Sequence, residues 1–343
     1  MSTFECGWVN NMMSVETDGW TRPCCLETGT PARIADISEG ILVAFNHPKL
    51  IELHTNLTDG YSVKTRNFCH RCEKLENNNQ VSMRNTTNIL KGPRELKTLQ
   101  FKMSNKCQLA CAHCGPDKSS TWAKLQNISP HVIDSFKVTD AFLNELKDLL
   151  PQLDVLKFSG GEPFLDPNHW KILDALKGCD RGHCKLEYIT NGLIKPKHEL
   201  WQGWGNVECS VSADGFEESF EWFRRGANWN ELIISVDSLS NHADISINFS
   251  VTPYTIQDYH AAKNYWKYPF STLQIVYPTH ADLFQFPREQ FMKLENYQTI
   301  PGYDSTMGSG GNLNKYRMWA HTWDSKWNTV GWANRIFDWM DDI

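Results

Sequence analysis

Cys107-Gln-Leu-Ala-Cys111-Ala-His-Cys114 is the stretch of this 343-residue chain that decides its predicted fold. It follows a predicted strand, Leu96–Met103, and precedes a polar stretch compatible with a helix from Ser119. The spacing of three residues and then two lets one tight loop turn the three sulfur atoms towards a single centre. That centre lacks one of the four protein ligands of a closed structural zinc site, whereas an iron-sulfur cluster held by three thiolates leaves one iron free to bind another molecule.

A second motif follows the next predicted strand, Val155–Phe158, and reads Ser159-Gly160-Gly161-Glu162-Pro163. The two glycines let the backbone pass close to a ligand, and the glutamate offers a carboxylate to a cationic amine. Alone, these residues would be only a turn. Because they come after a strand and downstream of the cysteine loop, they indicate a ligand site.

The Cys-x3-Cys-x2-Cys loop, with His113 before its last cysteine, and the Gly-Gly-Glu-Pro motif together resemble the radical S-adenosylmethionine superfamily. The resemblance implies that Cys107, Cys111 and Cys114 hold a 4Fe-4S cluster whose free iron binds S-adenosylmethionine. It implies that the reduced cluster cleaves this molecule to a 5′-deoxyadenosyl radical, with a reductant such as flavodoxin or ferredoxin as partner. The cofactor contacts that it implies here are His113, Gly160, Gly161, Glu162 and Pro163.

Composition narrows the class of protein. The formal net charge is -6 and no run of five Lys or Arg residues occurs, so a nucleic-acid partner is not expected. No stretch approaches eighteen apolar residues and the N-terminus lacks a signal-peptide pattern, so we expect a soluble cytoplasmic protein without membrane contact. Eleven cysteines in such a chain indicate metal or redox chemistry more than disulfides.

Predicted strands alternate with predicted helices over residues 91–286. This order implies right-handed βαβ units, a parallel sheet and therefore an α/β fold. By the resemblance, six such units form the partial (β/α)6 TIM barrel of the radical S-adenosylmethionine type. A helix is predicted after the cap Thr139, and others near Trp170, Trp222 and Trp229. The predicted strands are Leu96–Met103, Val155–Phe158, Leu186–Thr190, Val207–Val211, Ile245–Val251 and Leu273–Tyr277.

Chemistry in a parallel barrel sits at the carboxyl ends of the strands. The residues there resemble cofactor contacts of the family: Thr190 and Asn191 near the methionine moiety, Ser210, Ser212 and Asp214 on the fourth strand, Arg224 for the methionine carboxylate, and Val276 for adenine. Arg224 lies in Phe223-Arg-Arg-Gly226, which resembles a stretch of twitch-type radical enzymes. Two alternatives without cofactor contact are open: Asn191-Gly192 could be only a turn, and Arg224 could form a surface salt bridge.

Residues 1–90 are predicted to form a small β-rich or irregular module, since they contain an Asp18-Gly19 turn and short apolar runs such as Ile41–Phe45. The spacing of Cys6 and Cys24 around Gly19 resembles the opening of SPASM and twitch auxiliary-cluster domains. The resemblance implies a second 4Fe-4S cluster held by Cys6, Cys24, Cys69 and Cys72. The module would be permuted, because those domains normally follow the radical domain.

Three alternatives concern the same thiols. Cys25 could replace Cys24, because adjacent residues on a strand point to opposite faces. The four thiols could instead bind zinc, since Cys69-x2-Cys72 suits zinc equally well. A disulfide is the least expected reading in a cytoplasmic chain.

Residues 287–343 are predicted as an aromatic-rich helical extension. Trp319, Trp323 and Trp327 recur every four residues, so they share one helix face, which either closes the open side of the barrel or forms a platform for an aromatic substrate. Cys209 alternates with apolar residues and is expected in the core. Cys179 and Cys184 match no cluster spacing.

The leading hypothesis is an enzyme that abstracts hydrogen from a substrate, which the twitch and SPASM resemblance makes a peptide or protein more than a small molecule. Two alternatives come from other classes: an iron-sulfur electron-transfer protein, and a zinc-stabilised binding module without catalysis. The binding module does not explain the Gly-Gly-Glu-Pro motif after the second strand, and an electron-transfer protein would need clusters but no S-adenosylmethionine site. Specificity in such a fold lies in loops, so no substrate can be named from the sequence.

Overall fold

The structure, a computed structural model, describes residues 6–22, 24, 33–58, 69, 72–73, 76–77, 82, 84, 94–128, 137–274, 287, 289, 292–293 and 313–329. The chain divides into two compact units. Unit 1 takes in the described residues within Met1–Lys106, Asn127–Ile189 and Pro196–Glu208, and unit 2 those within Cys107–Gln126, Thr190–Lys195 and Cys209–Ile343.

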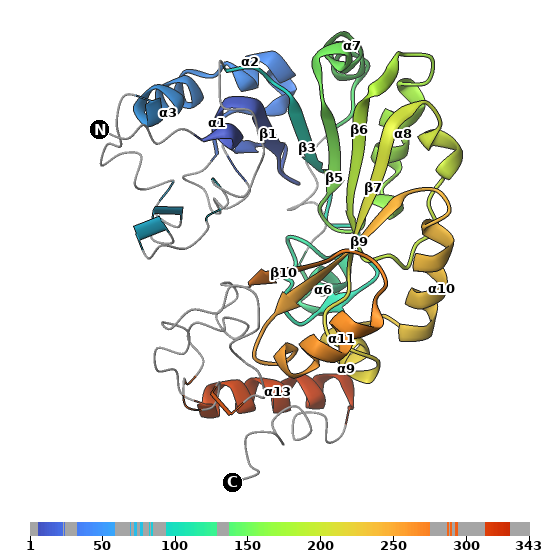
Figure 1. The fold of residues 1–343 in the computed structure, drawn as a ribbon. Coiled ribbons are helices and arrows are strands. Elements are labelled where there is room, and N and C mark those ends of the chain that lie inside the picture. Colours follow the sequence, from blue (N-terminus) through green and yellow to red (C-terminus); the bar gives the residue numbers. More distant parts are fainter. Residues whose placement is uncertain are drawn as a thin grey trace. The chain divides into compact units, whose positions relative to one another are not determined.

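Helices and strands carry the labels of Figure 1. Those of unit 1 are α1 (Gly7–Asn11), β1 (Met12–Val15), β2 (Thr21–Arg22), η2 (Ile37–Glu39), α2 (Ile41–Phe45), α3 (Pro48–Thr58), β3 (Thr98–Lys102), α7 (Asp140–Leu149), η4 (Leu150–Gln152), β5 (Val155–Ser159), η5 (Pro163–Leu165), α8 (Pro167–Ala175), β6 (Arg181–Thr190) and η6 (His198–Trp201). The last residue of β6, Thr190, is assigned to unit 2. Those of unit 2 are β4 (Ala110–Cys111), α6 (Ser120–Leu125), α9 (Glu218–Phe223), β8 (Arg224–Arg225), α10 (Trp229–Leu239), β9 (Asp244–Val251), η7 (Ile256–Asp258), α11 (Tyr259–Tyr265), β10 (Phe270–Gln274) and α13 (Leu313–Trp327). β7 (Trp204–Ser212) begins among the residues of unit 1 and ends among those of unit 2.

Unit 1 is built on a mostly parallel set of strands with the hydrogen-bonded order β6-β5-β3-β1-β2. β3, β5 and β6 pair in parallel, with Leu99 opposite Leu156 and Leu156 opposite Leu186. All three leucines are fully buried, so this register stacks apolar side chains across the strands. β1 adds a parallel strand beside β3, and β2 folds back on β1 as a hairpin.

Helices α7 and α8 pack against this ladder (Figure 1). The Thr139 hydroxyl caps α7 by accepting a hydrogen bond from Phe142 N at 3.2 Å. The Phe142 ring then meets the Phe101 ring of β3 edge-on, with centroids 5.6 Å apart. In α8, the His169 ring lies edge-on to Phe158 of β5 at 4.6 Å. The buried faces of the two helices therefore pack on the strands, as the helical spacing of their apolar residues predicts.

Unit 2 pairs β9 with β10 in parallel, and β7 is the next strand beyond β9 in the hydrogen-bonded order. A separate two-stranded antiparallel ribbon joins β4 to β8. Together with unit 1, the described strands give an α/β fold in which most pairing is parallel. Closure into a partial barrel remains a prediction.

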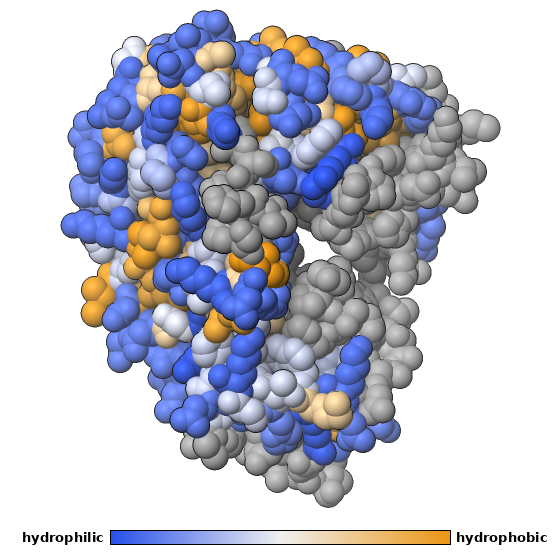
Figure 2. Space-filling model, turned by 180° about the vertical axis from the view of Figure 1, so that it is seen from behind, coloured by the Kyte–Doolittle hydropathy of each residue, from blue (hydrophilic) through white to orange (hydrophobic). Residues whose placement is uncertain are grey.

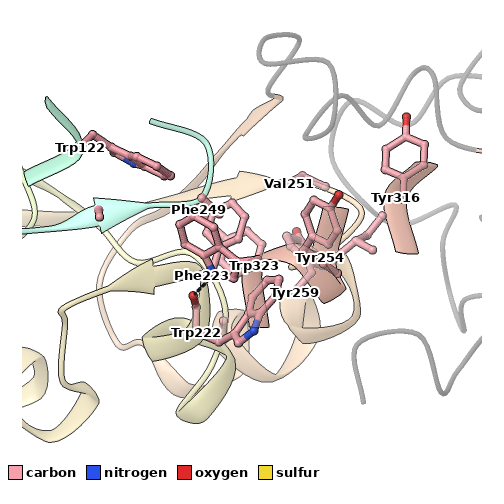
Figure 3. Close-up of a cluster of buried hydrophobic side chains, with 14 residues drawn as sticks. Trp122, Trp222, Phe223, Phe249, Val251, Tyr254, Tyr259, Tyr316 and Trp323 are labelled. Carbon is pink, nitrogen blue, oxygen red and sulfur yellow. Dashed lines mark hydrogen bonds between the residues drawn. The ribbon is translucent and has the colours of Figure 1, made fainter. Parts of the chain in front are cut away.

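Aromatic side chains fill the core of unit 2 (Figure 3). Trp323 of α13 donates its Nε1 hydrogen to Trp222 O of α9 at 3.1 Å. It also stacks on Trp319 with ring centroids 5.2 Å apart, and its ring lies 5.4 Å from that of Trp122. With 3% exposure, Trp323 is a packing residue. The predicted aromatic face of this helix is therefore largely a core contact.

The first five predicted strands are present with shifted ends; β6, for example, begins at Arg181 rather than Leu186. The sixth, Leu273–Tyr277, overlaps the end of β10, and its last three residues lie outside the described residues. The apolar run Ile41–Phe45, one of the signs of a β-rich or irregular N-terminal module, forms the helix α2 instead. Ile41, Ala44 and Phe45 are buried while Leu42 and Val43 are exposed, a pattern with helical period. The Asp18-Gly19 turn is confirmed, with Gly19 at φ 80° in the left-handed region.

No helix among the described residues is both long enough and apolar enough to span a membrane. The face shown in Figure 2 carries hydrophilic side chains over most of its described surface, with apolar residues in smaller groups between them.

Candidate active site

The cysteine loop is tied to the start of α6 by hydroxyl groups. Ser119 caps this helix by accepting a hydrogen bond from Trp122 N at 3.1 Å. Ser120 Oγ accepts one from Cys107 N at 3.1 Å, and Thr121 Oγ1 donates one to Cys107 O at 2.9 Å. The first cysteine of the loop is thus held by the helix that follows it.

The middle of the loop forms one strand of the β4–β8 ribbon, in which Cys111 lies opposite Arg224. Next to this pair, Ala112 N donates to Phe223 O at 2.8 Å. From α6, Trp122 Nε1 donates to Cys111 O at 2.9 Å. Cys111 is 4% exposed, so its backbone is fixed from two sides and its thiol is buried.

A buried ion pair lies beside this thiol. Arg224 Nη2 is 2.6 Å from Asp214 Oδ2, and Arg224 Nη1 is 3.9 Å from Cys111 Sγ. Asp214 Oδ1 accepts a hydrogen bond from Ser250 N at 2.6 Å. Although burial lowers it, the charges of Asp214 and Cys111 raise the pKa of Arg224 above its usual value. A hydrogen bond with Cys114 and burial raise the pKa of the Cys111 thiol.

His113 faces the same ion pair. Its ring stacks on Phe223 with centroids 5.2 Å apart and planes 16° apart. Its Nδ1 lies 3.9 Å from Asp214 Oδ2, and 15% of the side chain is exposed. The aromatic-type position before the last cysteine is therefore filled by a ring whose orientation is set by packing.

Thr190 and Asn191 lie within unit 2 beside the first cysteine of the loop. The amides of Gln108 and Asn191 exchange two hydrogen bonds, each of 3.2 Å, and Asn191 Nδ2 is 3.9 Å from Cys107 Sγ. Thr190 Oγ1 accepts a hydrogen bond from Gly192 N at 3.0 Å. The Asn191-Gly192 turn exists, with Gly192 at φ 75°, and it also contacts the cysteine loop.

Ser210 and Ser212 alternate with buried residues on β7. Cys209 and Val211 are fully buried, whereas both serines are partly exposed. The predicted division of this strand into a polar and an apolar face is thus observed, and Cys209 is a core residue as expected.

The donor set of the loop fits a cluster held by three thiolates. Three sulfur atoms come from one eight-residue segment. Arg224 lies next to one of them, and its buried Nε has no hydrogen-bond partner among the described residues. In the described part of the chain, no three His, Cys, Asp or Glu side chains already converge as a preformed metal site. A cluster would therefore draw Cys107, Cys111 and Cys114 together on binding.

In unit 1, the Gly-Gly-Glu-Pro motif lies against the residues that follow β3. Gly161 N donates to Ser104 O at 2.9 Å, and Glu162 N donates to Lys106 O at 2.6 Å. A Cβ atom at Gly161 would stand 2.4 Å from Lys106 O, so only glycine permits this approach. Glu162 is 1% exposed, and its Oε1 accepts a hydrogen bond from Phe164 N at 3.1 Å, which caps η5.

The N-terminal thiols also belong to unit 1. Cys6 is buried together with Leu53 and Leu57, and Cys69 packs against this group. Burial raises the pKa of the Cys6 thiol, and the nearby Cys72 adds to the rise. Cys24 is partly exposed, and Cys25 lies outside the described residues. Cys6, Cys69 and Cys72 are thus neighbours, while the group they hold stays a prediction.

Two contacts of the cysteine loop were not predicted from the sequence. One is the Arg224–Asp214 pair beside Cys111, and the other is the Trp122 indole on the Cys111 carbonyl. The first joins residues separated by a helix, and no sequence spacing encodes it. For the second, the spacing Ser119-x-x-Trp122 is a signal for a helix cap but does not indicate what the indole contacts. Val276, predicted near adenine, lies outside the described residues.

Comparison with known proteins gives one family. Residues 101–263 match the Radical SAM superfamily. Two curated relatives, both GTP 3',8-cyclase 1 from Mycobacterium tuberculosis (strains CDC 1551 / Oshkosh and ATCC 25618 / H37Rv), are each 24% identical over 152 residues, which is 43% of this chain and 40% of the relative. The chain thus spans about two fifths of the length of these relatives.

Among solved structures, a structure of TYW1 with a lysine-pyruvate adduct bound is 16% identical, with a TM-score of 0.28 over 44% of this chain and 54% of that chain. At that TM-score the likeness is too weak to indicate a shared fold.

Proposed function

Because residues 101–263 match the Radical SAM superfamily, we propose that this chain is an enzyme that reductively cleaves S-adenosylmethionine and abstracts a hydrogen atom from a bound substrate. The observation that supports this proposal most is the three-thiol loop, which lies inside the matched segment and whose middle cysteine is buried beside a guanidinium. A 4Fe-4S cluster bound there supplies the electron for the cleavage.

The roles of the protein's own groups follow from their chemistry. Cys107, Cys111 and Cys114 are the thiolate ligands, and Glu162 offers a carboxylate to the amino group of S-adenosylmethionine. In unit 2, Thr190, Asn191, Ser210, Ser212 and Asp214 are the proposed polar contacts, with His113 as the ring next to the cluster ligand. A flavodoxin- or ferredoxin-type protein is the proposed reductant.

For the substrate we favour a peptide or protein. This rests on the resemblance of the N-terminal cysteines to twitch and SPASM modules, and a second 4Fe-4S cluster on Cys6, Cys24, Cys69 and Cys72 is part of the same proposal. Such a cluster could accept an electron from a product radical, which makes a net oxidation the expected reaction. The relatives' names refer to GTP, but the chain covers 40% of them, so their substrate is not transferred to this chain.

The test is anaerobic reconstitution with iron and sulfide, reduction, and incubation with S-adenosylmethionine. We expect 5′-deoxyadenosine from the wild type and none from Cys107→Ala, Cys111→Ala or Cys114→Ala, because three thiolates leave no spare ligand. Cys179→Ala, which changes a cysteine outside both cysteine groups, is the matched control and should retain activity.

Two outcomes would contradict the proposal. Product formation by any of the three loop variants would refute the cluster ligands. A reduced wild-type chain that holds iron and sulfide but forms no 5′-deoxyadenosine would instead indicate an electron-transfer protein, and a colourless chain with zinc would indicate a binding module.

A further inference from the structure

Arg224 is confined by its surroundings. Its backbone belongs to β8, which pairs with β4, and its side chain is 8% exposed. One end of the guanidinium, Nη2, is committed to Asp214 Oδ2 at 2.6 Å. Because Asp214 is itself fully buried and held by Ser250 N at 2.6 Å, the carboxylate that anchors the guanidinium cannot turn away.

The other end of the same guanidinium points to sulfur. Nη1 lies 3.9 Å from Cys111 Sγ, within the range of an N–H···S hydrogen bond. A guanidinium presents its donors in a rigid planar fork, so the bond to Asp214 also fixes the direction of Nη1. The geometry is that of a buried cation that contacts a carboxylate through one terminal nitrogen and one particular cysteine through the other.

The neighbouring arginine is different. Arg225 lies next to Arg224 on β8 but is partly exposed, and its Nη2 donates to Trp327 O of α13 at 3.4 Å. Its guanidinium centre is 5.3 Å from the Trp327 ring centroid. Adjacent residues on a strand face opposite sides, and here only one of the two cations reaches a cysteine.

A cation that donates a hydrogen bond to a thiolate stabilises added negative charge on whatever the thiolate holds, more so in a buried place of low dielectric constant. Hydrogen bonds to the sulfur atoms are one of the features that set the reduction potential of iron-sulfur clusters. Reduction by one electron from an external donor adds one negative charge and breaks no bond. Arg224 is therefore placed to favour the reduced form.

We propose that Arg224 is a positioning residue that donates a hydrogen bond to the Cys111 thiolate and thereby raises the reduction potential of the cluster held by the loop, with Asp214 as the anchor that aims it. This rests on the proposed cluster on Cys107, Cys111 and Cys114. It differs from the role predicted from the sequence, in which Arg224 binds the methionine carboxylate of S-adenosylmethionine.

The test is an anaerobic potentiometric titration of the reconstituted full chain, with dithionite as reductant, following the EPR signal that responds to added S-adenosylmethionine. In Arg224→Gln we expect the ratio of reduced to oxidised cluster at the wild-type midpoint to fall at least tenfold, which is a shift of 59 mV for a one-electron couple. Arg224→Lys keeps the charge but loses the planar fork of donors, so its midpoint potential should lie between those of the wild type and Arg224→Gln. Arg225→Gln is the matched control and should keep the wild-type potential.

A buried Asp214 without its cation is costly, so Arg224→Gln could fail to fold. The double variant Arg224→Gln/Asp214→Asn removes both charges and should still show a lower potential than the wild type, because the bond to sulfur is lost.

Wild-type potentials in both the single and the double variant would overturn the inference. If the single variant Arg224→Gln also binds S-adenosylmethionine more than tenfold more weakly, Arg224 is a carboxylate ligand instead. A wild-type chain that binds no iron would refute the proposed function and this inference together, whereas iron binding with unchanged potentials refutes this inference alone.

Discussion

Glu162 has two possible tasks that a single substitution can separate. Its Oε1 already accepts a hydrogen bond from Phe164 N, so the carboxylate caps η5 whatever else it does. Glutamine keeps an oxygen for this cap but loses the negative charge that an ammonium group needs. The local structure and the affinity for a cationic amine should therefore respond differently.

We expect Glu162→Gln to weaken S-adenosylmethionine binding by about 1.5–3 kcal/mol, the range for a hydrogen bond to a charged group, with iron content and melting temperature unchanged. Equilibrium dialysis on the reconstituted chain measures the affinity. The control is Glu208→Gln, which alters a half-exposed ion pair with Lys185. Equal affinities in wild type and Glu162→Gln would mean that residues 160–163 serve only as a turn.

His169 makes unit 1 sensitive to pH. The ring is fully buried and its Nε2 shares a 2.9 Å hydrogen bond with the Tyr188 hydroxyl. Burial lowers the pKa of His169 from 6.5 to about 3. In the unfolded chain the imidazole binds a proton below about pH 6.5, while in the folded chain it does not until near pH 3, so falling pH through this window favours the unfolded state.

From this shift we expect His169 to remove roughly 1.4 kcal/mol of stability between pH 7.5 and pH 5.5. His169→Gln loses packing at every pH but should lose this particular dependence. Urea unfolding of wild type and variant at the two pH values isolates the effect, since all other titrating groups cancel in the difference. Parallel pH dependences in the two proteins would show that His169 takes up its proton while folded.

At the scale of elements, α13 is fastened to α9 by Asp324. Its Oδ1 accepts hydrogen bonds from Trp222 Nε1 at 2.7 Å and from Thr329 Oγ1 at 2.9 Å. Asp324→Ala leaves the buried indole N–H without this acceptor, which costs about 1–3 kcal/mol. We expect faster amide hydrogen exchange across α13, measured by mass spectrometry. Asp324→Asn keeps the acceptor and should exchange more slowly than Asp324→Ala.

The matched control for that experiment is Ser325→Ala. Ser325 follows Asp324 on the same helix, but it is exposed and its hydroxyl donates to the preceding turn, at His321 O. Its removal should change exchange little. If Ser325→Ala and Asp324→Ala loosen α13 equally, the aromatic packing of Trp323 and not the Asp324 bond holds the helix in place.

A helix or strand can be predicted from the sequence when its hydrophobic pattern extends over enough residues to show a clear period. α7 has a capping Thr139 and four buried apolar residues at helical spacing, so both its start and its face are predictable. β1 has four buried residues with no alternation, and the two-residue strands β4 and β8 have no pattern at all. Such strands exist because a neighbour supplies the hydrogen bonds, which only the folded chain reveals.

The candidate site divides in the same way. The cysteine spacing and the glycines of residues 160–161 are predictable because a chemical or steric requirement fixes the residue type, as the 2.4 Å approach of a Cβ at Gly161 illustrates. The direction of Arg224 is not, since it depends on the β4–β8 pairing and on the buried Asp214. The role predicted for its side chain came from a resemblance, whereas its contacts come from packing.

At the scale of the whole molecule, the seven cysteines proposed as cluster ligands form two groups, one in each unit. Cys107, Cys111 and Cys114 belong to unit 2, and Cys6, Cys24, Cys69 and Cys72 to unit 1. If each group holds a 4Fe-4S cluster, the reconstituted chain should contain about eight iron atoms, and the triple variant Cys107→Ala/Cys111→Ala/Cys114→Ala about four. That variant should stay brown and fail to cleave S-adenosylmethionine, because a cluster with four protein ligands has no free iron.

Metal analysis of this triple variant tests the N-terminal group without any substrate. Cys179→Ala added to the wild type is the control and should keep about eight iron atoms. A colourless triple variant with one zinc would mean that Cys6, Cys24, Cys69 and Cys72 form a closed tetrahedral site, which has no redox chemistry. In that case the N-terminal group could not accept an electron from a product radical, and the argument for a net oxidation would be lost while the proposal for the cysteine loop would stand.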